Sequence, residues 1–140
     1  MYRKVTIRQC GVEDEAYLFV LARDVFGDRQ GFQERRTLDV LDSDLVFVAE
    51  VEDVVAGYAA VERAGDAVRI ELLLVSPVHD DEHVETQLLE YAEGYAISVA
   101  ARSLQVIVEA DNEQAFAFYR TRGFVPVGPE LLELILPEPA

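Results

Sequence analysis

Runs of apolar residues that alternate with polar ones, or continue unbroken for a few positions, recur along the chain and are typical of β-strands. The first is an alternation over residues 2–7. Further strands are predicted at residues 45–51, 54–62, 68–75, 103–109, 124–127 and 131–136. The run over 68–75 is so continuously apolar near its end that we expect both of its faces to be covered.

Other segments place apolar residues three or four positions apart, which is the spacing of an amphipathic helix. Helices are predicted through Leu18 and Leu21, more weakly over 32–41, at length over 81–101, and over a short stretch that begins at 111–114. Residues 111–114 have the pattern of a capping box, and Gly123 is expected to end this short helix.

The predicted order is strand, two helices, three strands, helix, strand, helix and two strands. Because a long helix connects the strands at 68–75 and 103–109, these two are expected to run parallel in an otherwise antiparallel sheet. The length of 140 residues, without a linker pattern, indicates one domain over residues 1–140. The sequence therefore predicts an α+β fold with a mixed sheet of about seven strands and about four helices. A ligand crevice is expected beside the parallel pair.

The charge balance narrows the classes of partner. The chain has 12 basic and 27 acidic residues, which gives a net charge of −15. This charge argues against a nucleic acid or an anionic membrane as partner. A hydrophobic share of 51% supports a full core. Acid excess with Lys4 as the only lysine is similar to proteins of salt-loving microbes. With no signal-peptide pattern and Cys10 as the only cysteine, we expect a cytoplasmic protein.

Three segments resemble the GNAT superfamily of acetyl-CoA-dependent N-acetyltransferases. Val55-Ala56-Gly57-Tyr58 is similar to the usual third strand of the family, and Ile70 to Pro77 matches the strand that ends in Val-x-Pro. The most specific segment is Asn112-x-x-Ala115-x-x-Phe118-Tyr119-x-x-x-Gly123-Phe124, which resembles the family signature at every marked position. The resemblance covers essentially the whole chain and implies a GNAT-like sheet whose parallel pair is splayed.

The resemblance also implies an activity, which is direct transfer of an acetyl group from acetyl-CoA to a primary amine of a small molecule or peptide. The backbone of Leu73, Leu74 and Val75 would hold the cofactor arm and polarise the thioester carbonyl. Tyr119 would protonate the departing thiolate, since a phenol is protonated at neutral pH. The residues expected to contact the cofactor from the next helix are Asn112 and Phe118.

Glu71 is the candidate general base. By period-two alternation it shares a strand face with Leu73 and Val75, so it would take the amine proton directly or through water. Simpler interpretations stand beside these roles. Glu71 would then be one more surface carboxylate, Asn112 or Asp111 a helix cap, and Tyr119 a packing aromatic with its hydroxyl in solvent.

The sequence departs from the family after Val-x-Pro. The family pattern there is Arg or Gln, two residues, Gly, one residue, then Gly or Ala, which lets backbone amides approach the cofactor pyrophosphate. Aligned from Pro77, this chain has Asp80, His83 and Glu85 at the three places. Acidic side chains stabilise a helix start that binds no ligand, but they repel a pyrophosphate. Salt at about 1 M would screen this repulsion beyond ~3 Å.

This departure leaves other functions open. One is a catalytically silent GNAT-fold binding or regulatory module that has lost acetyl-CoA affinity. Another is a metal site at His79 and His83, whose i, i+4 spacing suits one ion on a helix. The acceptor is undetermined, although Arg35 and Arg36 lie in the region that would contact it. Exposed strands near the C-terminus could pair two copies into a homodimer.

Overall fold

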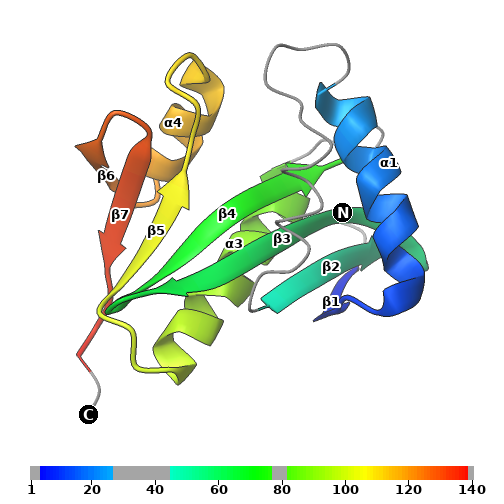
Figure 1. The fold of residues 1–140 in the computed structure, drawn as a ribbon, viewed down its shortest axis with the longest axis horizontal. Coiled ribbons are helices and arrows are strands. Elements are labelled where there is room, and N and C mark those ends of the chain that lie inside the picture. Colours follow the sequence, from blue (N-terminus) through cyan, green and yellow to red (C-terminus); the bar gives the residue numbers. More distant parts are fainter. Residues whose placement is uncertain (1–3, 27–44, 77–81, 139–140) are drawn as a thin grey trace.

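One seven-stranded sheet organises the protein, in the order β1-β2-β3-β4-β5-β7-β6 (Figure 1). The computed structural model describes residues 4–26, 45–76 and 82–138. The strands are β1 (Val5–Gln9), β2 (Leu45–Val51), β3 (Val54–Ala64), β4 (Ala67–Val75), β5 (Ser103–Ile107), β6 (Val125–Gly128) and β7 (Leu131–Ile135). Only β4 and β5 pair in parallel, and all the other neighbours are antiparallel. The predicted mixed sheet with one parallel pair is therefore confirmed.

Helices lie on both faces of this sheet. They are the short 3-10 helix η1 (Val12–Asp14), α1 (Glu15–Phe26), α3 (Glu82–Ser98) and α4 (Glu113–Arg120). In Figure 1, α1 crosses the front of the sheet and α3 lies behind it. The helix predicted over 32–41 falls outside the described residues. The first strand begins later than predicted, at Val5, and the long helix ends earlier, at Ser98.

Two buried clusters explain why β2, β3 and β4 read as nearly continuous apolar runs. One cluster packs under α3 and α4 and includes Phe47, Ile70 and Leu88. The other packs under α1 and includes Leu18 and Tyr58. Strands covered on both faces need apolar residues at every position, so the alternation expected of a half-exposed strand is lost there.

Gly57 on β3 lies close to β4 and α3. A Cβ atom at this position would lie 2.5 Å from the carbonyl oxygen of Leu74 and 3.3 Å from Cδ1 of Leu88. The first of these distances is a clash with backbone, which cannot swing away as a side chain can. Only glycine therefore fits between β4 and α3 at this point of β3.

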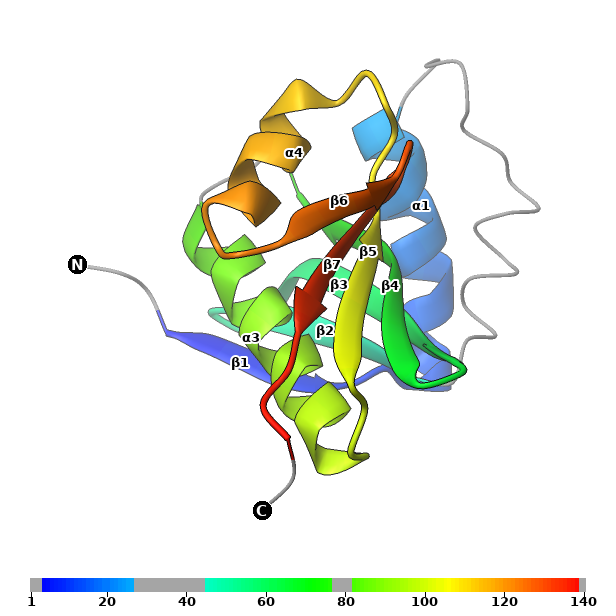
Figure 2. The same ribbon diagram turned by 90° about the vertical axis from the view of Figure 1, so that its left-hand side faces the viewer.

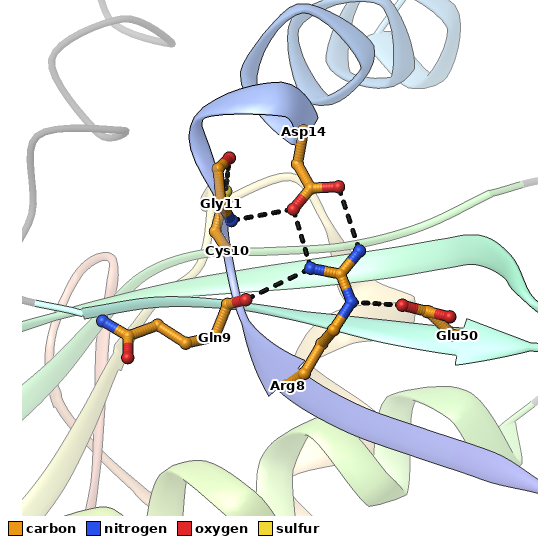
Figure 3. Close-up of polar contacts among 6 residues, drawn as sticks. All are labelled: Arg8, Gln9, Cys10, Gly11, Asp14 and Glu50. Carbon is orange, nitrogen blue, oxygen red and sulfur yellow. Dashed lines mark hydrogen bonds and ion pairs between the residues drawn. The ribbon is translucent and has the colours of Figure 1, made fainter.

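A cluster of charges joins the edge of the sheet to η1 (Figure 3). The guanidinium of Arg8 on β1 donates from Nη1 and Nη2 to the Asp14 carboxylate, at 2.8 and 3.0 Å, and its Nε donates to Glu50 on β2. The backbone amide of Gly11 also donates to Asp14, at 2.8 Å. These bonds from Arg8 hold the pKa of Asp14 below its ordinary value, and they raise that of Arg8. We call Arg8, Asp14 and Glu50 the edge cluster.

The other edge of the sheet is β6. Its residues Val125 and Val127 are exposed, as is Ile135 on the neighbouring strand β7. An exposed edge strand offers unpaired backbone groups to another chain. The homodimer expected from these strands stays a prediction.

Candidate active site

The parallel strands β4 and β5 separate along their length and leave an opening in the sheet. Their pairing runs from Ala67 opposite Ser103 to Ile70 opposite Val106 and ends there. Figure 1 shows the two arrows diverging from a common end into a V. Beyond Ile70, the described strand that pairs with β4 is β3 on its other side. The edge of β4 that faces β5, at Leu73 to Val75, thus carries backbone groups available to a ligand.

A β-bulge lies at the point where the strands part. On β3 the consecutive residues Ala60 and Val61 pair with Leu72 and Ile70, so Glu71 is an extra residue in β4. Leu72 packs with the cluster under α1, whereas Leu73 packs with the cluster under α3 and α4. At a bulge, two residues oppose one on the partner strand. The bulge therefore interrupts the period-two alternation at Glu71, and the face that Glu71 shares with Leu73 and Val75 stays a prediction.

Asn112 caps helix α4, which follows β5. Its side-chain Oδ1 accepts a hydrogen bond from the backbone amide of Ala115, at 3.1 Å. This bond satisfies one of the amides that a helix start leaves without an intrahelical partner. The capping role predicted as the simpler interpretation of Asn112 is confirmed, and it engages only the oxygen of the carboxamide.

Tyr119 is buried near the end of α4. Its ring packs edge-on against Phe118, with centroids 5.1 Å apart, and against Phe124 at 5.4 Å. The residue is only 5% exposed, and its ring packs as the simpler interpretation of a packing aromatic predicts. Burial raises its pKa well above the ordinary value, the nearby Glu85 raises it further, and Arg122 lowers it. The phenol therefore stays protonated throughout the physiological pH range.

Helices α3 and α4 meet beside Tyr119 at a line of contact that we call the α3–α4 seam, formed by Glu85, Thr86, Phe118, Tyr119 and Arg122. In Figure 2 the end of α4 lies next to the start of α3. Arg122 crosses this junction, because its Nη2 donates to the Thr86 hydroxyl at 3.0 Å. Sequence reasoning missed Arg122, whose only signal was its place one residue before Gly123 in the family signature.

His83 and Glu85 lie in the first turn of α3 and are partly exposed. Asp80 and His79 fall outside the described residues, so the structure tests neither the aligned loop nor the paired-histidine alternative. Within residues 4–26, 45–76 and 82–138 there is no group of three or more metal-ligating side chains. Glu85 is close enough to Tyr119 to raise the pKa of its hydroxyl, so its carboxylate places a negative charge in the seam.

Comparison with known proteins gives the family. Residues 14–134 match the model of the acetyltransferase (GNAT) domain. The chain belongs to the GNAT family. A comparison with curated proteins finds no match.

Solved structures agree with the GNAT fold. Ard1 from Thermoplasma volcanium superposes with a TM-score of 0.80 at 20% identity, over 96% of this chain and 99% of that one. The ribosomal-protein-S18-alanine N-acetyltransferase from Escherichia coli gives 0.80 at 17%, over 98% and 97%. The PaiA N-acetyltransferase from Thermoplasma acidophilum, solved with coenzyme A, gives 0.77 at 15%, over 95% and 99%. At such identities these similarities establish the fold alone.

The GNAT sheet carries a second polar group on the face opposite α3 and α4. Arg69 on β4 donates from Nε and Nη2 to Oε1 of Gln105 on β5, both at 3.1 Å. Gln105 in turn donates to Glu133 on β7, at 2.9 Å, and the Ser103 hydroxyl donates to the same carboxylate. This chain of bonds spans three strands within the paired segment of β4 and β5, and it ties the closed end of the V together.

The described helices hold no stretch that is both long and apolar enough to cross a bilayer.

Proposed function

We propose that this single-domain GNAT protein transfers the acetyl group of acetyl-CoA to a primary amine by direct attack. The observation that carries the proposal is the open edge of β4 at Leu73 to Val75. A backbone amide on this edge, held in place by the pairing with β3, can donate to the thioester carbonyl as negative charge develops there. The acyl carrier supplies the activated acetyl group, the acceptor supplies the amine, and the chain supplies the hydrogen-bond donor, the acid and the base.

Tyr119 is the proposed general acid. It belongs to the same buried cluster as Leu73 and Val75, at the splay side of α4. When the amine nitrogen bonds to the acetyl carbon and the carbon–sulfur bond breaks, the phenol gives its proton to the departing sulfur. Its raised pKa keeps that proton in place until the sulfur carries charge.

Glu71 is the proposed general base, and its place in β4 supports this role. An amine must reach the acetyl carbon from a direction that the cofactor arm does not occupy. Glu71 lies in β4 at the point where the pairing with β5 ends, beside the open edge at Leu73 to Val75. A carboxylate there can take the proton of the attacking amine, directly or through water.

Ligand binding is the first test. Thermal unfolding in concentrated KCl is measured with and without CoA, which at about 100 times its Kd should add ~2.7 kcal/mol to the free energy of unfolding. Acetylation of an amine panel is then compared between the wild type and Tyr119→Phe. The variant should lose at least about a hundredfold in kcat with little change in the Kd for CoA. Tyr91→Phe, at an exposed tyrosine of α3, is the matched control and should behave as wild type.

A second candidate function rests on Glu85. A carboxylate in the first turn of α3 opposes an anionic ligand at that helix start, which fits a GNAT-fold binding module that has lost its cofactor. Folded protein that shows no shift in unfolding temperature at millimolar CoA would overturn the acetyltransferase proposal and favour this module.

A further inference from the structure

The α3–α4 seam lies on the side of the sheet where the cofactor arm must leave. Residues of both helices, among them Leu88 and Phe118, pack into the same buried cluster on one face. Tyr119 also lies on this face, so a thioester sulfur that takes its proton must be oriented toward it. A ligand whose sulfur lies beside Tyr119 would therefore have the seam on the same face of the sheet.

Arg122 is the cation of that seam. Its guanidinium carbon sits 3.7 Å above the centroid of the Phe118 ring. Nη1 donates to the backbone oxygen of Phe118 at 2.9 Å and to the Thr121 hydroxyl at 3.2 Å, and Nη2 donates to Thr86. These bonds fix the plane of the guanidinium across the gap between the helices. They use three of its five N–H groups, which leaves two donors for a ligand.

The partners of Arg122 are all neutral. The acceptors found for it are a carbonyl oxygen and two hydroxyls, and the ion pairs found among the described residues both belong to Arg8. A fixed guanidinium without a carboxylate partner, partly open to solvent, is suited to bind the oxygens of a phosphate.

We propose that Arg122 binds the phosphates of CoA. The inference rests on the proposed function, because it requires CoA to occupy the splay. Arg122 would then attract the phosphates, which the glycine-poor start of α3 is not suited to do. Its guanidinium comes from just beyond the end of α4, lies over the Phe118 ring and is held by the bond to Thr86.

Three ligands of decreasing charge test this role: CoA, 3′-dephospho-CoA and pantetheine, which has no phosphate. Dissociation constants are measured by calorimetry for the wild type, Arg122→Gln and Arg122→Lys. Arg120→Gln, an exposed arginine two residues earlier, is the matched control for loss of one positive charge. The unfolding temperature of each variant without ligand reports its folding.

Arg122→Gln should weaken CoA binding about ten- to a hundredfold, since a hydrogen bond to a charged group contributes on that scale. Its Kd for pantetheine should change less than about twofold, Arg122→Lys should restore part of the CoA affinity, and Arg120→Gln should leave both unchanged. The dependence of log Kd for CoA on log [KCl] should also become shallower in Arg122→Gln.

Two results would overturn the inference while leaving the acetyltransferase proposal intact. One is CoA affinity in Arg122→Gln equal to that of wild type. The other is an equal loss for CoA and pantetheine, which would assign Arg122 to the packing of Phe118 and Tyr119. Wild-type protein that binds neither ligand would instead refute the proposed function itself.

Discussion

Arg8 and Arg122 are two arginines of one strongly acidic chain, and their surroundings differ in kind. Arg8 in the edge cluster bonds two carboxylates, so its charge is neutralised where it lies. Arg122 in the α3–α4 seam bonds neutral oxygens and an aromatic ring. The first arrangement holds a strand and a helix start together. The second holds a positive charge in place without cancelling it, which is the condition for attracting an anion.

The largest expected effect comes from breaking the edge cluster. Asp14→Ala removes two bonds from Arg8 and the bond from the Gly11 amide. The free energy of unfolding should fall by about 2 kcal/mol, less than for a fully buried pair because the Arg8 side chain is 37% exposed. Urea denaturation measures the loss. In the protein that remains folded, the Kd for CoA should not change. A changed Kd would show that the edge cluster also affects CoA binding and would contradict the contrast between the two arginines.

Acid should weaken the edge cluster in a way that depends on Asp14. Its pKa is lowered in the folded protein from an unfolded value of about 3.8, so the folded state favours the ionised carboxylate. The stabilisation is complete above that value, and it is lost as the pH falls through the lowered folded pKa. Denaturation of the wild type and of Asp14→Asn at pH 7 and pH 3 isolates this effect from the other acids. The gap between the two proteins should narrow at pH 3, and a constant gap would contradict the prediction.

The seam should respond in the opposite sense, with a small change in stability and a large change in binding. Arg122→Gln loses a ring contact and bonds to neutral acceptors, so the free energy of unfolding without ligand should fall by less than about 1 kcal/mol. Arg8→Gln, the matched substitution in the edge cluster, should cost more. If Arg122→Gln proves the more destabilising, Arg122 is a structural residue as Arg8 is.

The smallest effect is expected at Thr86. Thr86→Val removes the hydroxyl that accepts from Nη2 of Arg122 and keeps the shape of the side chain. The free energy of unfolding should change by a few tenths of a kcal/mol, since the side chain of Thr86 is partly exposed. The Kd for CoA should rise by about two- to threefold, because the guanidinium loses one of the bonds that hold its plane. Thr121→Val, at the weaker hydroxyl contact of 3.2 Å, should change the Kd less.

Much of the fold could be predicted because local patterns determine it. The strand over 45–51 and the start of α4 at Asn112 follow from apolar runs and cap chemistry that a few neighbouring residues decide. The bulge at Glu71 could not be predicted, because it depends on the register that β4 adopts against β3. The period-two rule therefore does not carry through this point of β4.

The candidate site was predictable only where the family signature names it. Tyr119 and Asn112 are marked positions of that signature, whereas Arg122 is an unmarked position whose only signal is that it precedes Gly123. The difference between Arg122 and Arg8 arises from contacts across the fold, with Thr86 lying 36 residues from Arg122 and Glu50 lying 42 from Arg8. Partners at such separations become visible only when the sheet and helices are assembled.

Gly57 has a consequence for how the sequence can change. A methyl group there would meet the Leu74 carbonyl, in the part of β4 where the acetyl group is proposed to sit, so even alanine should be rejected. Gly94, midway along α3, has no atom within 4 Å of an added Cβ, and alanine there should stabilise the helix by about 0.5–1 kcal/mol. In a library of all single substitutions selected for folded protein, position 57 should be the least permissive glycine and position 94 among the most permissive. The tolerance of these two glycines to substitution would thus report where the backbone of the sheet leaves no room for a side chain.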